Sequence, residues 1–248
     1  SGEVRVNGGR AKPDYRVEAG DELRIPPVRT AQRPARQAPP SNPALERAVL
    51  FEDAHLLAIN KPAGLAVHGG SGVNFGAIEQ LRSQRPDARF LELVHRLDRD
   101  TSGLLLVART RPALRILHEL LREGQIEKRY LTLVKGSWDL GTKLIDAPLL
   151  THTRSGGERT VRVAPNGKES STTFAPVDFF GARATLLDVT LGTGRTHQIR
   201  VHLSAIGHPI VGDALYGGLR RRVPGDVRAV THLRSEEHTS ELQSRGLI

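Results

Sequence analysis

The feature that most restricts the fold of this chain is a charged stretch enclosed by two short, mostly apolar runs. Residues 91–94 and 103–107 have the composition of buried strands, and residues 95–102 between them read HRLDRDTS. A polar loop between buried strands lies at the end of a sheet, where loops often carry chemistry. On its own, the same stretch also fits a solvated turn in which Asp98 or Asp100 caps backbone amides.

The spacing of apolar residues elsewhere predicts further strands and helices. Pro112 is typical of a helix start, and Gly124 and Gly207 are typical of helix ends. Strands are expected over 48–51, 56–59, 128–134 and 183–191, and helices over 75–85, 112–123 and 196–205. This order favours a mixed α+β domain built on an extended sheet.

Composition divides the chain into four segments. Residues 1–29 contain short alternating patterns separated by turn residues, as in a small β unit, and residues 30–46 form a Pro-rich linker. Residues 47–233 form the main domain. Residues 234–244 (RSEEHTSELQS) match the translation of a common sequencing-library adapter, so we expect residues 234–248 to be an artefact tail outside the fold.

Composition also excludes several classes of protein and site. The chain has no cysteine, which rules out disulfides and thiolate chemistry, and its net charge of +9 suits a polyanionic partner such as nucleic acid. No apolar run approaches the roughly 20 residues that span a bilayer, so we expect a cytoplasmic protein. The absence of methionine indicates that the sequence is a fragment.

A second basic cluster, residues 194–202, reads GRTHQIRVH and lies where a strand pattern passes into a helix pattern. Backbone amides at a helix start favour anions, although solvated arginines on a capped helix fit equally well. A metal site is not expected, because His197 and His202 are five residues apart and do not share one helix face. The glycine-rich residues 68–72 lack the Gly-Lys-Ser/Thr ending of a triphosphate-binding loop.

Together these motifs resemble those of the RluA-type pseudouridine synthases. The resemblance runs from about residue 2 to 233, and it includes residues 60–64 (NKPAG), 95–98 (HRLD) with 101–103 (TSG), 128–130 (KRY), 167–168 (GK), and 194–202 with 207–209 (GHP). It implies the pseudouridine synthase catalytic fold, with a mixed, mainly antiparallel sheet flanked by helices. It also implies that residues 1–29 are the C-terminal half of an S4-like RNA-binding domain.

The resemblance assigns roles to individual residues. Asp98, rather than Asp100, matches the catalytic carboxylate, Tyr130 the tyrosine beneath the target base, and Arg200 the arginine that pairs with the carboxylate. Arg96 matches the residue that enters the space of the extruded base. Further substrate-binding residues are expected at His95, Lys61, Arg195, His197 and Lys168.

The implied reaction converts uridines of 23S (large-subunit) ribosomal RNA to pseudouridine without metal or other cofactor, in a protein expected to be a monomer. Because the reacting atoms lie inside a stacked helix, the uridine has to be flipped out. Three alternatives are a related synthase acting on tRNA, a non-catalytic RNA-binding or ribosome-assembly module, and a metal-dependent phosphoesterase. The module would not need Asp98, and the phosphoesterase would lose activity with a chelator.

Overall fold

The protein divides into two compact units, Ser1–Ala38 and Pro39–Ile248. The computed structural model describes residues 4–12, 14–24, 39, 41–70, 73–153, 159–217 and 233–236. Most of the expected linker and the glycine-rich residues Ser71 and Gly72 lie outside the described residues.

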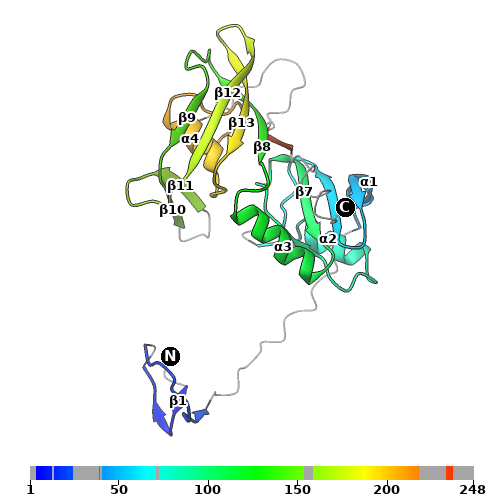
Figure 1. The fold of residues 1–248 in the computed structure, drawn as a ribbon, viewed down its shortest axis with the longest axis vertical. Coiled ribbons are helices and arrows are strands. Elements are labelled where there is room, and N and C mark those ends of the chain that lie inside the picture. The colour runs from blue at the N-terminus through cyan, green and yellow to red at the C-terminus, as the bar shows by residue number, and fades with distance from the viewer. Residues whose placement is uncertain are drawn as a thin grey trace. The chain divides into compact units, whose positions relative to one another are not determined.

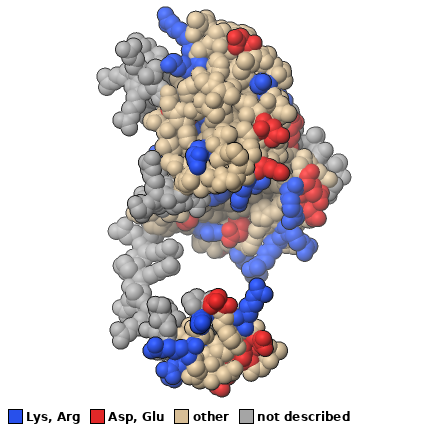
Figure 2. All heavy atoms as spheres, turned by 90° about the vertical axis from the view of Figure 1, so that its left-hand side faces the viewer, with Lys and Arg blue, Asp and Glu red and all other residues tan. Residues whose placement is uncertain are grey.

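The small unit is a three-stranded antiparallel sheet of order β2-β1-β3, formed by β1 (Arg5–Val6), β2 (Gly9–Arg10) and β3 (Leu23–Arg24). Asn7 and Gly8 both have positive φ, as a two-residue type I′ hairpin turn requires. Figure 2 shows basic and acidic side chains interleaved on the visible face of this unit. Its likeness to an S4 domain stays a prediction.

The large unit contains a nine-stranded sheet with the order β4-β5-β7-β14-β8-β13-β12-β9, and β6 pairs with β7 beside this path (Figure 1). Of the described strand pairs in this sheet, only β14–β7 is parallel, which confirms the expected mixed, mainly antiparallel sheet. The strands are β4 (Val49–Glu52), β5 (Leu56–Lys61), β6 (Glu92–Leu93), β7 (Ser102–Ala108), β8 (Arg129–Lys135), β9 (Lys143–Asp146), β12 (Ser171–Phe180), β13 (Ala184–Leu191) and β14 (Leu233–Glu236).

The described part of this unit also contains four helices and a separate hairpin. The helices are α1 (Pro43–Arg47), α2 (Ala77–Gln84), α3 (Arg111–Arg122) and α4 (Gln198–Ala205), and the hairpin pairs β10 (Leu149–Thr153) with β11 (Arg159–Val163).

The core has two main clusters that use alternate residues of β7. Leu105 belongs to a cluster with residues of α2 and α4, whereas Leu106 belongs to a second cluster with Leu117 and Leu120 of α3. Because successive strand residues point to opposite faces, α3 covers the face of the sheet opposite to α2 and α4.

The structure differs from the sequence-based segments in two places. Helix α1 lies at the end of the expected linker, because Pro43 suits the first helical turn and Glu46 is bound by Arg85 of the main unit. Strand β14 continues past Leu233 into the stretch expected to be an artefact tail. Strand pairing uses backbone groups, so it does not depend on the origin of these residues.

Candidate active site

The loop that carries Asp98, residues 95–101, is held from the end of β5. The ammonium of Lys61 is fully buried and donates hydrogen bonds to the carbonyl oxygens of Pro62 (3.0 Å), Leu65 (2.8 Å) and Arg99 (3.0 Å). The Gly64 amide donates to the same Arg99 oxygen at 2.9 Å, with φ +84° at Gly64. The backbone next to Asp98 is therefore fixed by buried bonds.

The structure places Lys61 differently from the expected substrate-binding residue. With no exposed surface and its ammonium bonded to three carbonyls, its side chain is directed into the protein. Burial lowers the pKa of Lys61 to about 8, against the opposing effect of the Asp100 and Asp98 charges. Lys61 positions the loop.

Asp98 is paired with Arg200 of α4, which lies 102 residues further along the chain. Arg200 Nη1 donates to Asp98 Oδ2 at 3.0 Å, and the other nitrogens of the guanidinium bind a second carboxylate. Arg200 Nε and Nη2 donate to Oδ2 and Oδ1 of Asp213 at 2.7 and 3.0 Å. Such a bidentate pair fixes the plane of the guanidinium, and with it the nitrogen that faces Asp98.

Asp213 is almost completely buried, with a side chain 1% exposed, whereas that of Asp98 is 31% exposed. Burial by itself raises the pKa of Asp213, but the hydrogen bond and charge of Arg200 outweigh burial and lower it. Burial lowers the pKa of Arg200, and the two carboxylates outweigh that effect and raise it. An ionised Asp213 is thus a fixed anchor, and Asp98 is the carboxylate that a ligand can reach.

His197 and Tyr216 lie beside this cluster. His197 Nε2 is 3.8 Å from Asp98 Oδ2, and its Nδ1 is 2.8 Å from the Tyr216 hydroxyl. The Tyr216 ring packs against the Arg200 guanidinium, 5.0 Å from the ring centroid. His197 precedes α4 with φ 54°, a left-handed conformation that few residues other than glycine adopt.

Tyr130 lies in the core of the large unit, and Arg96 lies on its surface. Tyr130, near the start of β8, is 8% exposed and belongs to the same core cluster as Leu97 and Ile199, which flank Asp98 and Arg200 in sequence. Arg96 is exposed, and its side chain forms no hydrogen bond or ion pair with another described residue. Its guanidinium is available to a ligand.

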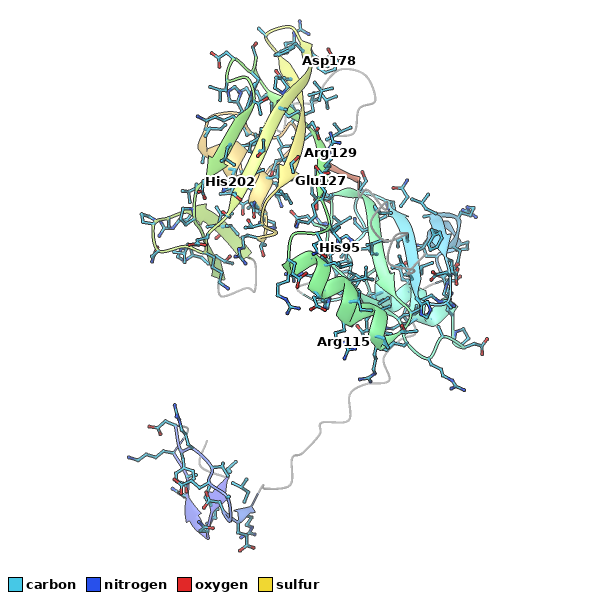
Figure 3. The ribbon with its side chains drawn as sticks, in the orientation of Figure 1. His95, Arg115, Glu127, Arg129, Asp178 and His202 are labelled. Atoms are coloured by element: carbon cyan, nitrogen blue, oxygen red, sulfur yellow. The ribbon has the colours of Figure 1, made fainter. Side chains whose placement is uncertain are left out.

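His95 has a clear structural contact. Its Nε2 accepts a hydrogen bond from the Leu106 amide of β7 at 3.1 Å, and Figure 3 shows it beside the sheet near α3. Burial lowers the pKa of His95 to about 4, with a further contribution from the Lys128 charge, so the ring is neutral at pH 7. This contact holds the start of the Asp98 loop to β7.

Lys168 and Arg195 lie on neighbouring exposed segments. Arg195 Nε donates to the carbonyl oxygen of Glu169 at 3.0 Å, and the Lys168 backbone pairs with Leu149 of β10. Both side chains are exposed. They provide two positive charges near the base of the β10–β11 hairpin.

Sequence reasoning missed Asp213 and Tyr216. Gly212-Asp213 reads as an ordinary turn, and no local pattern connects it to Arg200. An acidic residue shortly after the basic cluster 194–202 was the only available signal.

No group of three His, Asp or Glu residues with metal-binding geometry occurs in the described part of the chain. His202, labelled on α4 in Figure 3, is buried, and its ring nitrogens contact Thr172 Oγ1 (3.0 Å), Ser170 Oγ (3.2 Å) and the Ala147 oxygen (3.0 Å). Of the described helices, none is long and apolar enough to cross a membrane.

Comparison with known proteins gives a consistent result. Residues 55–205 match the family model described as RNA pseudouridylate synthase. The ribosomal large subunit pseudouridine synthases C of Salmonella typhimurium and Escherichia coli K12 are each 57% identical over 219 residues, which cover 87% of this chain and 68% of the relative.

Two solved human structures share the fold. RNA pseudouridylate synthase domain containing 1 has a TM-score of 0.61 at 27% identity and covers 76% of each chain. RNA pseudouridylate synthase domain containing 4 has a TM-score of 0.60 at 27% identity, covering 83% of this chain and 78% of the human one.

Proposed function

Because the chain belongs to the RNA pseudouridylate synthase family, we propose that Asp98 is the carboxylate with which this enzyme isomerises uridines of 23S (large-subunit) ribosomal RNA. The relatives named for the large ribosomal subunit support this RNA as the substrate. A monomeric state and a cytoplasmic location stay predictions from the sequence.

The reaction breaks the C1′–N1 bond, turns the uracil and joins C1′ to C5. N1 gains a proton and C5 loses one, so the base keeps its composition and no oxidant is consumed. An ionised carboxylate beside the ribose assists either by attacking C1′ or by removing a C2′ proton. Arg200 pairs with the Asp98 carboxylate at 3.0 Å and orients it.

The observation that carries the proposal is the pairing of Asp98 with Arg200 at 3.0 Å. Asp98 keeps a partly exposed side chain, while Arg200 is fixed from behind by Asp213. Among the residues that the structure describes, Asp100, two residues away, pairs only with its neighbour Arg99, at 3.3 Å on the surface. Of the two carboxylates in the loop, Asp98 therefore has the preorganised environment of a catalytic group.

We assign the remaining expected residues either to the flipped base or to the phosphate backbone of the RNA. We assign the buried Tyr130 ring as the platform for the flipped base, and the exposed Arg96 as the side chain that fills the vacated space. Lys168 and Arg195 suit contacts to phosphates. His197 lies next to the Asp98 carboxylate.

The test is pseudouridine formation in unmodified large-subunit ribosomal RNA, without added metal, by the wild type and by Asp98→Asn and Asp100→Asn. Loss of the reactive carboxylate should reduce the single-turnover rate by about a thousandfold or more, while RNA affinity is retained. Asp100→Asn is the matched control and should stay within a few-fold of wild type.

The other outcomes contradict the proposal in different ways. Equal loss in both variants would show that the loop rather than Asp98 is required. RNA binding without product by the wild type would favour the non-catalytic module. Product from tRNA alone would replace the ribosomal substrate and leave the role of Asp98 intact.

A further inference from the structure

We propose that Tyr216 fixes His197 in the tautomer that carries its proton on Nε2, so that this N–H faces the Asp98 carboxylate as a second donor beside Arg200. Tyr216 and His197 are thus positioning residues for the isomerisation. The inference rests on the proposed role of Asp98.

The hydrogen bonds around the Tyr216 hydroxyl determine the tautomer. The Val161 amide of β11 donates to this oxygen at 3.0 Å, and His197 Nδ1 lies 2.8 Å from it. A phenol has one proton to donate, and Nδ1 is the only acceptor that contacts it among the described residues. The hydroxyl therefore donates to Nδ1, which leaves the imidazole proton on Nε2.

The other groups around His197 agree with a neutral ring. Burial lowers the pKa of His197, the Asp98 charge opposes this, Arg200 lowers it further and Asp213 opposes it. Burial also raises the pKa of Tyr216, which keeps the phenol protonated as a donor. At neutral pH, a neutral imidazole with one defined N–H thus lies beside the carboxylate.

The backbone of His197 gives an independent reason to assign it a role. Its φ of 54° and ψ of 19° are in the left-handed region, which is unfavourable for a residue with a Cβ. Such conformations persist where the surroundings hold them and are common at active sites. Here the edge-to-face packing of His197 on Tyr216, with centroids 5.6 Å apart, supports the conformation.

The separation of 3.8 Å between Nε2 and Asp98 Oδ2 is longer than a hydrogen bond. At this distance the N–H dipole still stabilises the carboxylate, and catalytic contacts often shorten when substrate binds. The Tyr216 hydroxyl also contacts β11, so the position of the β10–β11 hairpin is linked to the orientation of His197 through one atom.

The first test uses the free protein, without RNA, so its result is separate from the proposed function. Nitrogen-15 NMR of the histidine side chains, with His197 assigned from a His197→Gln variant, should show Nε2 protonated and Nδ1 at the shift of a hydrogen-bonded acceptor. In Tyr216→Phe the Nδ1 shift should move to that of an acceptor without a bond, whereas the control Tyr15→Phe should leave it unchanged. A proton on Nδ1 in the wild type, or no change in Tyr216→Phe, would overturn the inference.

The second test measures single-turnover rates and RNA affinity. Loss of one neutral hydrogen bond should slow Tyr216→Phe about 3- to 10-fold with unchanged RNA Kd. His197→Gln, which retains a donor, should be faster than His197→Leu. Equal rates for those two variants would overturn the role of the N–H, and a wild type that forms no product would refute the proposed function while the NMR result still stands.

Discussion

Replacing Asp213 by Asn tests whether the buried carboxylate is the anchor of Arg200. The Asn oxygen can occupy the place of Oδ1, where it keeps the bonds from Arg200 Nη2 and from the amides of Leu215 and Tyr216. The amide nitrogen then faces Arg200 Nε, so a charge-assisted bond of 2.7 Å becomes a contact between two donors. A hydrogen bond to a charged group contributes about 1.5–3 kcal/mol to stability. Because the variant also brings two donors together, we expect its free energy of unfolding to fall by about 3 kcal/mol.

Urea unfolding measures this loss, and Glu46→Gln provides the matched control. Glu46 binds Arg85 with the same bidentate geometry, at 3.0 and 2.7 Å, but its side chain is 36% exposed compared with 1% for Asp213. Because solvent screens this ion pair, Glu46→Gln should lower the free energy of unfolding by about 1 kcal/mol or less. Equal losses in the two variants would refute the reasoning from burial.

The pH dependence provides a second check. The pKa of Asp213 is lowered below its ordinary 3.8, so its contribution is present above pH 3.8 and is lost as the pH falls through the folded-state pKa. The difference in the free energy of unfolding between wild type and Asp213→Asn should therefore become smaller only in that acid range. The variant should also lose at least about tenfold in single-turnover rate, because Arg200 no longer holds one orientation toward Asp98.

Three further substitutions give sharp expectations. Lys61→Met removes a donor from three part-buried carbonyl oxygens, of which only that of Arg99 keeps another donor, the Gly64 amide, and it should lower the free energy of unfolding by about 2–4 kcal/mol; a loss under 1 kcal/mol in urea would contradict its role in the loop. His95 has a pKa of about 4 against 6.5 unfolded, so wild-type stability should fall by about 1.4 kcal/mol for each pH unit from 6.5 toward 4, and His95→Gln should flatten this slope. Thr132→Val removes a buried hydroxyl that has no partner among the described residues and should raise stability by about 1 kcal/mol, measured by thermal melting; a lower Tm would show that the hydroxyl is satisfied.

Local sequence patterns predicted the elements with strong periodicity. Helix α3 has its apolar residues on one face, a Pro in its first turn and a Gly after its end, and it was predicted to within a residue or two. Strand β12 was not predicted, because Pro176 interrupts its pattern and the register with β13 shifts between Pro176 and Asp178. Its burial depends on neighbours that the local sequence does not specify.

The site was predictable only where a family resemblance supplied the long-range information. Asp98 and Arg200 were paired from that resemblance, and the structure brings them together. No sequence pattern near Asp213 predicts that it is buried, because its low exposure results from the packing of α4 against the turn that follows the helix. Lys61 was expected to bind substrate, whereas in the structure it is buried and donates to backbone carbonyls. Its burial depends on how the Asp98 loop packs in the folded protein, which the local sequence does not specify.

Strand β14 has a consequence for how the two halves of the site are brought together. It lies between β7 and β8, and among the described strands it alone joins the half of the sheet that carries Asp98 to the half that carries Tyr130 (Figure 1). It follows both Asp98 and Arg200 in the chain and pairs Arg234 with Ser102, a contact of very long sequence separation. Contacts of such long sequence separation form late in folding, so the half of the sheet that carries Asp98 and the half that carries Tyr130 are held in register only once β14 has paired with both.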